Sequence, residues 1–241
     1  MPIGNRPAFL DFTQLKLNVP DTATQTQSTK NYLNSNFDSL IRQMRSEPAP
    51  NFKEASHAPD YCSTRRSGFY ERHNNFMLSN TGEDAFIHAR REPAHCAGQF
   101  DGDKFHISIK REEVSQAFNA LRGRLFSDDS PIDKWKVTDM QRAEPGSRIS
   151  EGAQFTLYVK LDLEDAQCTA KELNHVRFFV ECLESTLTES RIQPGQHPDS
   201  DIRPPSWQYV SYRNELRSHR EGSEAQRQML SDEPFYRLVT E

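Results

Sequence analysis

The sequence predicts a mixed fold in which amphipathic helices accompany an amphipathic β-sheet. Three segments carry apolar residues at helical spacing, and four shorter segments alternate apolar with polar residues. No internal repeat and no Gly/Ser-rich linker divides the chain, which at 241 residues is long enough to bury a sizeable core. We therefore expect a single large domain, residues 31–241, preceded by a flexible arm, residues 1–30.

The predicted arm is polar, apart from one apolar island. Residues 18–36 are crowded with Thr, Gln, Ser and Asn and offer little surface to bury. Within the island, Leu15, Leu17 and Val19 alternate with polar residues. This spacing suits an extended peptide in the groove of a partner protein, and equally an N-terminal strand that docks on its own domain.

Helical periodicity predicts three helices. The first covers residues 30–45 and stops before Pro48, because proline cannot continue a helix. The second lies over residues 114–125, and the third is a long helix over residues 173–187 that faces a core. The apolar positions that define them are Leu33, Phe37, Leu40, Ile41 and Met44; Val114, Phe118, Leu121 and Leu125; and Leu173, Val176, Val180, Leu183 and Leu187.

Segments with a period of two predict strands at residues 85–90, 104–109, 134–138 and 154–161. In each segment one face is apolar, and the other, here called the outward face, is mostly polar or basic. The residues expected on the outward face are Phe86, His88 and Arg90; Lys104, His106 and Ser108; Lys134, Lys136 and Thr138; and Thr156, Tyr158 and Lys160.

The outward face is biased toward positive charge. It carries Lys, Arg and His but no Asp or Glu, although 30 basic and 35 acidic residues give the chain a net charge of −5. A solvated outer face of an antiparallel sheet, the simplest alternative, would carry both signs. The bias therefore indicates an anion site, to which the basic run 212–220 would add guanidinium groups that bind phosphate.

Composition excludes several classes of protein. The net charge argues against a general binder of nucleic acid or anionic membranes, and no apolar run reaches the length of a membrane helix. Cys62, Cys96, Cys168 and Cys182 contain no Cys-x-x-Cys motif and predict neither a disulfide scaffold nor a zinc ribbon. Because residues 1–20 contain no signal peptide, we expect folding in a reducing cytosol.

The common phosphate-handling and metal-binding motifs are missing. The sequence has no P-loop, no cysteine followed six positions later by arginine, and no Asp-x-Asp-x-Thr/Val motif. The one metal-like cluster comprises His88, His95, Cys96 and His106, and its spacing matches no common site. We therefore expect no metal.

The lysine, histidine, tyrosine and arginine side chains that remain can support an elimination. Arginines and a lysine neutralise a phosphate and make it a better leaving group. A protonated histidine can protonate the departing oxygen, and a desolvated lysine among other cations can act as a base. A base, an acid and an anion clamp without a nucleophile favour elimination over hydrolysis. On composition alone, a phosphate-binding module is the simpler interpretation.

Five strings stand in order along the chain: FIHARR at 86–91, GDKFHIS at 102–108, DKWKVTDM at 133–140, GAQFTLY at 152–158 and SYRNELRS at 211–218. Together they resemble the phosphothreonine lyase family of bacterial type III secreted effectors, the OspF/SpvC class. The resemblance spans nearly the whole chain. It implies an α+β fold: a single domain with a strongly twisted sheet, helices packed on its apolar face and a flexible N-terminal arm.

The resemblance also implies an activity. Members of the family remove phosphate from the phosphothreonine of the pThr-x-pTyr activation loop of host MAP kinases and so suppress host immune signalling. They do so irreversibly by β-elimination, which leaves dehydrobutyrine and uses no metal and no cofactor. A hydrolytic protein phosphatase and a non-catalytic phosphopeptide-binding module remain the alternatives, and the product that each leaves separates them.

Catalytic roles follow from the same resemblance. Lys136 matches the general base that takes the α-proton, His106 the general acid that protonates the leaving oxygen, and Tyr158 an active-site tyrosine. The residues matched to substrate phosphates are Lys104, Arg148, Arg213, Arg220 and Arg90. Of these, Lys104 would also depress the pKa of Lys136, and Arg220 is associated with the neighbouring phosphotyrosine.

The resemblance further implies partners. The family's arm carries a kinase-docking segment, whose apolar part Leu15, Leu17 and Val19 match. A polar N-terminus without a signal peptide fits export by the bacterial type III secretion machinery into the host cytoplasm, with the host nucleus as a further compartment. Neither nucleic acid nor a membrane is an expected partner.

Overall fold

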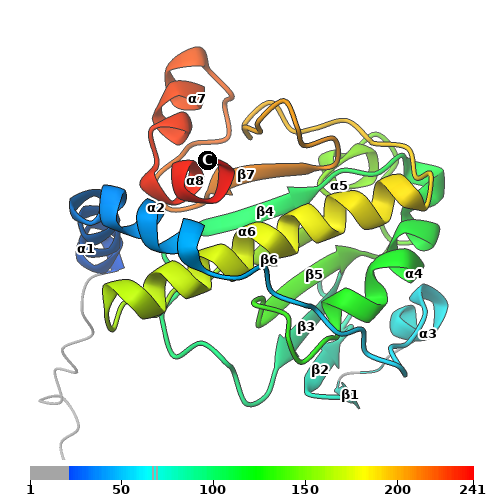
Figure 1. Ribbon diagram of the computed structural model, residues 1–241. Helices are drawn as coiled ribbons and strands as arrows, with labels where there is room; N and C mark the ends of the chain where they lie inside the picture. Colours follow the sequence, from blue (N-terminus) through cyan, green and yellow to red (C-terminus); the bar gives the residue numbers. More distant parts are fainter. Residues whose placement is uncertain (1–21, 67, 69) are drawn as a thin grey trace, which may run out of the picture.

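The computed structural model describes residues 22–66, 68 and 70–241 and has the expected α+β architecture (Figure 1). Its helices are α1 (Thr22–Ser35), α2 (Phe37–Ser46), α3 (Tyr61–Arg65), α4 (Val114–Leu125), α5 (Arg148–Glu151), α6 (Ala166–Glu189), α7 (Glu224–Ser231) and α8 (Pro234–Thr240). Its strands are β1 (Glu71–His73), β2 (Phe76–Ser79), β3 (Phe86–Arg91), β4 (Asp103–Ile107), β5 (Lys134–Thr138), β6 (Phe155–Tyr158) and β7 (Val210–Asn214). The docking candidates Leu15, Leu17 and Val19 lie outside the described residues.

The strands form one antiparallel sheet in the order β1-β2-β3-β5-β6-β4-β7. All four predicted strands are confirmed, as β3, β4, β5 and β6, with ends that shift by at most three residues. Strand β4 pairs with β6 and β7 and not with its predecessor β3, so that Phe105 lies opposite Leu157 on one side and Tyr212 on the other. Segments far apart in the sequence therefore become neighbours at this end of the sheet.

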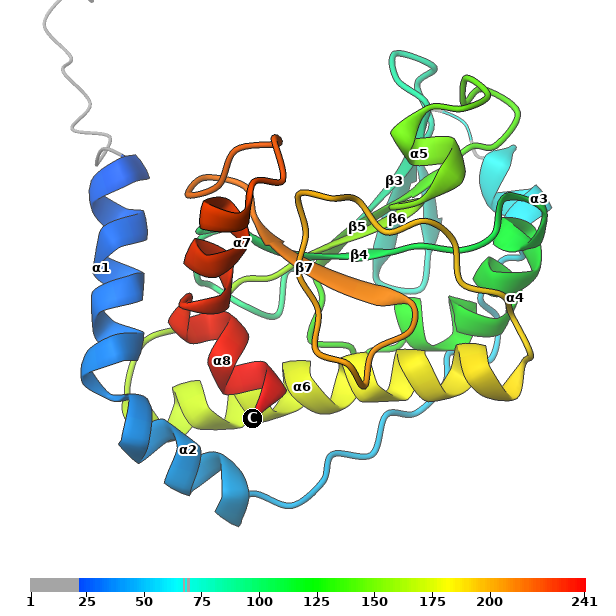
Figure 2. The same ribbon diagram turned by 90° about the horizontal axis from the view of Figure 1, so that it is seen from above.

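Helices cover the apolar face of the sheet. Figure 2 shows α2, α4 and α6 on one side, and the short α5 with several loops on the other. The long α6 begins at Asp165, whose carboxylate accepts hydrogen bonds from the backbone N–H groups of Gln167 and Cys168, each at 2.8 Å. The apolar residues that predicted this helix are all buried: Leu173, Val176, Val180, Leu183 and Leu187. None of the described helices is long and apolar enough to cross a bilayer.

The first predicted helix, residues 30–45, is in fact two helices that meet at Asn36. The Asn36 side-chain amide and backbone N–H both donate to the Tyr32 carbonyl, at 2.9 and 3.1 Å. Asparagine favours such local bonds over helix continuation, and here α1 ends one residue before it. Helix α1 begins at Thr22, inside the segment predicted as an arm, and packs near α8 through a Lys30–Glu233 ion pair of 3.0 Å.

Three strands were not predicted. Strands β1 and β2 are short, with three and four residues, and give little periodicity to detect. Strand β7 lies at the start of the run 212–220 that was interpreted only as a basic segment. It lies at the edge of the sheet, yet every residue of it is buried, because the chain crosses it at an isolated bridge between Ile202 and Tyr212.

Candidate active site

The outward face carries two rows of side chains that run across adjacent strands. The first row comprises His88, Lys136, Thr156, His106 and Ser211 on β3, β5, β6, β4 and β7. The second row comprises Arg90, Lys134, Tyr158, Lys104 and Arg213 on the same strands. Directly opposed residues of antiparallel strands have Cβ atoms about 5 Å apart on one face. The pairing therefore brings Lys136, His106, Tyr158, Lys104 and Arg213 together on one face of the sheet. The alternate residues of these strands, such as Phe105 and Leu157, belong to the core on the other face, which α6 covers (Figure 2).

Several ionisable groups of the two rows are buried although α2, α4 and α6 cover only the other face. Lys104 is 6% exposed, and His106 and Arg213 are each 3% exposed. Loops and α5 supply the cover on this side (Figure 2). Buried charges are retained in folded proteins when they are paired or bind a charged ligand. Buried lysine, arginine and histidine side chains that lie close together are what an anion site requires.

A buried carboxylate orients His106. The Nδ1 atom of His106 lies 2.6 Å from Oδ2 of Asp201, whose side chain is fully buried. Asp201 also accepts hydrogen bonds of 3.0 Å from the hydroxyls of Ser200 and Ser211. Arg148 approaches the same carboxylate at 3.4 Å. Because Nδ1 is occupied by Asp201, Nε2 is the ring nitrogen left for a substrate.

The protonation of this pair reflects its burial. Burial lowers the pKa of His106, while Asp201 acts in the opposite direction. Burial alone would raise the pKa of Asp201, but His106 and Arg148 outweigh it and the pKa is lowered. Asp201 therefore remains a carboxylate, and the charge of His106 depends on what else enters the site.

Lys136 has a different environment from His106. Its Nζ atom lies 3.7 Å from the centroid of the Phe86 ring, a cation–π arrangement. Burial lowers the pKa of Lys136, and the charge of Lys104 lowers it further. Asp84 and Glu215 act in the opposite direction without cancelling the shift. A lowered pKa increases the fraction of the lysine that carries a free amine at a given pH.

The remaining cations surround the position between the two rows. Lys104 forms a 2.9 Å ion pair with Glu215, and Arg213 donates to the Ser200 hydroxyl at 2.8 Å. Burial lowers the pKa of Lys104, and the charges of Arg213 and Arg148 add to that effect. Three cations thus act on one another within a small volume. Glu215 is the carboxylate that pairs with Lys104 here, and its charge also acts on Arg213.

Tyr158 lies between Lys104 and Lys134 in the second row. The Lys134 ammonium lies 4.9 Å from the centroid of the Tyr158 ring. The Phe100 ring packs edge-on against the Tyr158 ring, with 5.4 Å between the two ring centroids. Burial, followed by the charges of Glu215 and Asp84, raises the pKa of Tyr158 to about 12. The phenol is therefore a neutral hydrogen-bond donor at physiological pH.

Of the predicted site residues, Arg90 lies away from this centre, whereas Arg220 lies at its border, where its charge acts on those of Arg148 and Arg213. Arg90 belongs to the second row but stands three strands from Lys104, which is about 14 Å at normal strand spacing. Its side chain is 68% exposed, and its guanidinium pairs with Glu92. Arg220 lines a neighbouring cavity of about 310 Å3 together with Arg148 and Ser200.

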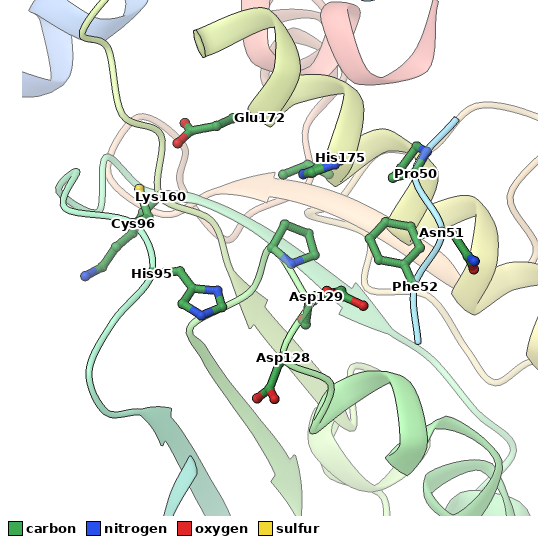
Figure 3. Close-up of a pocket in the computed structure, with 13 residues that line it drawn as sticks. Pro50, Asn51, Phe52, His95, Cys96, Asp128, Asp129, Lys160, Glu172 and His175 are labelled. Atoms are coloured by element: carbon green, nitrogen blue, oxygen red, sulfur yellow. The ribbon is translucent and has the colours of Figure 1, made fainter. Parts of the chain in front are cut away.

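The metal-like cluster of the sequence is separated in space. His106 is in the first row, and His88 pairs with Asp84 at 2.9 Å. His95 and Cys96 instead line a cavity of about 380 Å3 beside Glu172 and His175 of α6, on the helix side of the sheet (Figure 3). Among the described residues no three potential ligands gather around one point. Lys160, expected on the outward face, lines this cavity as well, because β6 ends at Tyr158.

Sequence reasoning missed Asp201 and Glu215. Asp201 stands 95 positions after His106 in a proline-rich crossing, where no periodicity assigns a side chain to a face. Glu215 was seen only as one acid within a basic run. The single available signal was the SYRNELRS string itself, in which an acid follows the β7 arginine by two positions.

Comparison with known proteins identifies the family. The chain matches the OspF/SpvC family over residues 2–241. Two relatives align over all 241 residues of this chain and over their own full length: a MAPK phosphothreonine lyase of Salmonella typhimurium, 52% identical, and phosphothreonine lyase OspF of Shigella flexneri, 51% identical. The solved structure of the Chromobacterium violaceum VirA (SpvC) phosphothreonine lyase effector is 57% identical with a TM-score of 0.85, covering 89% of this chain and all of that one. Since these matches include every strand that carries the two rows, the protein belongs to the OspF/SpvC family.

Proposed function

We propose that the protein is a phosphothreonine lyase that acts on MAP kinases, as its Salmonella and Shigella relatives are named to do. One observation carries the proposal within the site itself. Lys136 and His106 stand in the same row with Thr156 between them, and Lys104 and Arg213 stand next to them in the second row. A base and an acid thus face one position from two sides, with cations alongside for a phosphate.

Lys136 is the proposed general base. A phosphothreonine carries an acidic hydrogen on Cα and the phosphate on the adjacent Cβ. The free amine of Lys136 removes the α-proton, and the lowered pKa keeps that amine available. The ammonium that results lies over the Phe86 ring, whose face stabilises a cation.

His106 is the proposed general acid. The arriving phosphate places negative charge beside the ring and so raises the pKa of His106, which burial lowers in the empty site. The imidazolium then donates its Nε2 proton to the leaving oxygen. The Cα–H bond breaks, the Cα=Cβ bond forms and the Cβ–O bond breaks, so that dehydrobutyrine remains in the peptide and phosphate departs. No water is consumed, and no step calls on a metal or cofactor.

Lys104, Arg148 and Arg213 are the proposed phosphate clamp, and Tyr158 is a proposed hydrogen-bond donor to the same substrate. Arginine binds phosphate through two parallel N–H groups, and charge that develops on the leaving group is stabilised by donors already in place. Arg213 is held by Ser200 and by the carbonyl of Ser218, at 2.8 and 3.3 Å. The clamp is therefore organised before substrate arrives.

The proposed substrate is the doubly phosphorylated pThr-x-pTyr segment. Two residues of extended chain span about 7 Å, so a second phosphate reaches past the first row toward the neighbouring cavity. Arg148 and Arg220 line that cavity. We assign Arg220 to the phosphotyrosine, and leave Arg90 as a remote contact for the flanking peptide.

The remaining proposals concern delivery and docking. The Shigella relative is a type III effector, and we extend to this protein export by the type III machinery into the host cytoplasm. We also assign kinase docking to Leu15, Leu17 and Val19. Deleting residues 1–21 tests the docking: turnover of an intact phosphorylated kinase should fall much more than turnover of a short phosphopeptide, because tethering raises local substrate concentration. Equal losses on both substrates would contradict it.

The decisive test is the mass of the product. A peptide with both phosphothreonine and phosphotyrosine is incubated with the protein and its sites are mapped by fragmentation. A lyase leaves the threonine position lighter by one water than dephosphorylated threonine, and leaves phosphotyrosine intact. A phosphatase would leave threonine, and a binding module would leave the peptide unchanged. Either of these products refutes the proposal.

A further inference from the structure

The active site contains a carboxylate to which the mechanism gives no role. Glu215 lies at the mouth of the site, with its Oε2 atom 2.9 Å from the Nζ atom of Lys104. Lys104 is nearly buried, with a side chain 8% exposed, while that of Glu215 is 40% exposed. The negative charge of Glu215 also reaches Lys136 and Tyr158. The one lysine of the proposed phosphate clamp is therefore already paired with an anion of the protein itself.

The backbone around Glu215 holds it at this position. Its N–H donates to the Gly102 carbonyl at 2.7 Å, which ties the end of β7 to the start of β4. The Asn214 side chain accepts from the backbone N–H groups of Leu216 and Arg217 and closes the turn that follows. Gly102 has a φ of +95°, and a Cβ there would come within 2.5 Å of the Asn214 Oδ1 atom. A compact turn thus presents Glu215 to Lys104.

The two carboxylates of the site differ in how firmly they are held. Asp201 has no exposed side-chain surface and accepts from Ser200, Ser211 and His106. Among the described side chains, Glu215 forms an ion pair with Lys104 alone, and it borders solvent. Water can solvate the partly exposed Glu215 carboxylate when it leaves, and an arriving phosphate takes its place beside the buried Lys104 ammonium, which therefore never stays unpaired. Asp201 is therefore fixed, whereas the Glu215 carboxylate can leave.

We propose that Glu215 is the resting occupant of the phosphate site: its carboxylate neutralises Lys104 in the empty enzyme and is displaced by the substrate phosphate. This inference rests on the proposed function and adds a determinant of substrate selection to it. A phosphate monoester carries a charge of about −1.5 to −2 and three strong acceptor oxygens, so it engages Lys104, Arg148 and Arg213 together. A carboxylate of a peptide offers Lys104 the same single charge as Glu215, so its replacement of Glu215 would not lower the free energy. The site thereby excludes acidic side chains of unphosphorylated segments.

The experiment measures the affinity of Glu215→Gln and of the wild type for inorganic phosphate by calorimetry. Removing the resting occupant should tighten phosphate binding by about three- to tenfold, the range expected for a partly exposed charged contact. Glu215→Asp keeps the charge and should stay close to the wild type. Glu181→Gln removes an equal charge from α6, where Glu181 pairs with Arg177 at 3.2 Å, and should change nothing.

The sign of the change decides the inference. If Glu215 served only to hold Lys104 in place, Glu215→Gln would weaken phosphate binding, and this result or an unchanged affinity overturns the proposal. In turnover, the same variant should lower KM for the phosphothreonine peptide by a similar factor. Calorimetry with phosphate needs no catalysis. If the wild type made no dehydrobutyrine, the lyase proposal would fail. The phosphate affinities would still decide whether Glu215 occupies the phosphate site.

Discussion

The acid side and the base side of the site are built in opposite ways. On the acid side, His106 is 3% exposed and tied to a buried carboxylate that two hydroxyls and an arginine also contact. On the base side, Lys136 is half-buried, lies against the Phe86 ring and has no ion pair with a carboxylate among the described residues. An acid needs a fixed ring nitrogen, whereas a lysine base must be able to lose its proton. A neighbouring carboxylate helps the first and would hinder the second.

The largest effect should come from the base side. Lys136→Ala should lower kcat by about 10³-fold or more, at the upper end of what a general base contributes, while phosphopeptide binding largely survives. The measurement is single-turnover formation of dehydrobutyrine, with peptide affinity by calorimetry. Lys171→Ala on the exposed side of α6 is the matched control. A Lys136→Ala enzyme that kept a tenth of wild-type kcat would remove Lys136 from its role.

The acid side should respond next. Asp201→Asn keeps the shape of the side chain but loses the charge that raises the pKa of His106, and should lower kcat by about 10²-fold. The inflection of the pH–rate profile that belongs to His106 should move to lower pH. Asp38→Asn, an exposed position on α2, should leave both unchanged. A loss of activity with an unmoved inflection would mean that Asp201 serves the fold alone, which thermal melting would reveal independently.

The Phe86 ring offers a third comparison, because it borders both Lys136 and the space for the substrate. If the threonine methyl rests on this ring, a phosphoserine peptide should react about 10–200-fold less efficiently than a phosphothreonine peptide. Phe86→Ala should narrow that ratio by removing the wall. Measurements of kcat/KM for both peptides decide the matter. An unchanged ratio in Phe86→Ala would place the methyl elsewhere.

The smallest effect should come from a distant charge on the base side. The groups that face Lys136 are Lys104 of β4, Lys134 of its own strand, His88 of β3, Glu215 after β7 and Asp84 before β3. Asp84 raises the pKa of Lys136, so Asp84→Asn should move the Lys136 inflection to lower pH, by a fraction of a unit because Asp84 borders solvent. A shift to higher pH would contradict this assignment of charges.

The long amphipathic elements and the outward face could be predicted from sequence, because periodicity reports which side chains share a face. Lys104, His106, Lys136 and Tyr158 were placed on that face before any strand order was known. Pairing order leaves no such periodic trace, so the two rows and the remote place of Arg90 could not be predicted. Asp201 and Glu215 could not be predicted, because irregular loops have no periodicity that assigns a side chain to a face. A pairing between an acid and a distant cation can be recognised only when both are placed in space.

In this protein the register of β4 determines both the alignment of the catalytic side chains and the stability of the fold. Along β4, Lys104 and His106 alternate with Phe105 and Ile107, both fully buried in the core. A slip of β4 by one residue would turn the lysine and histidine into the core and expose the two apolar side chains. The free energy that buries Phe105 and Ile107 therefore also excludes every misaligned version of the catalytic face. Molecules that fold with a shifted β4 would be unstable as well as inactive, so the population that survives is one in which acid, base and clamp are aligned.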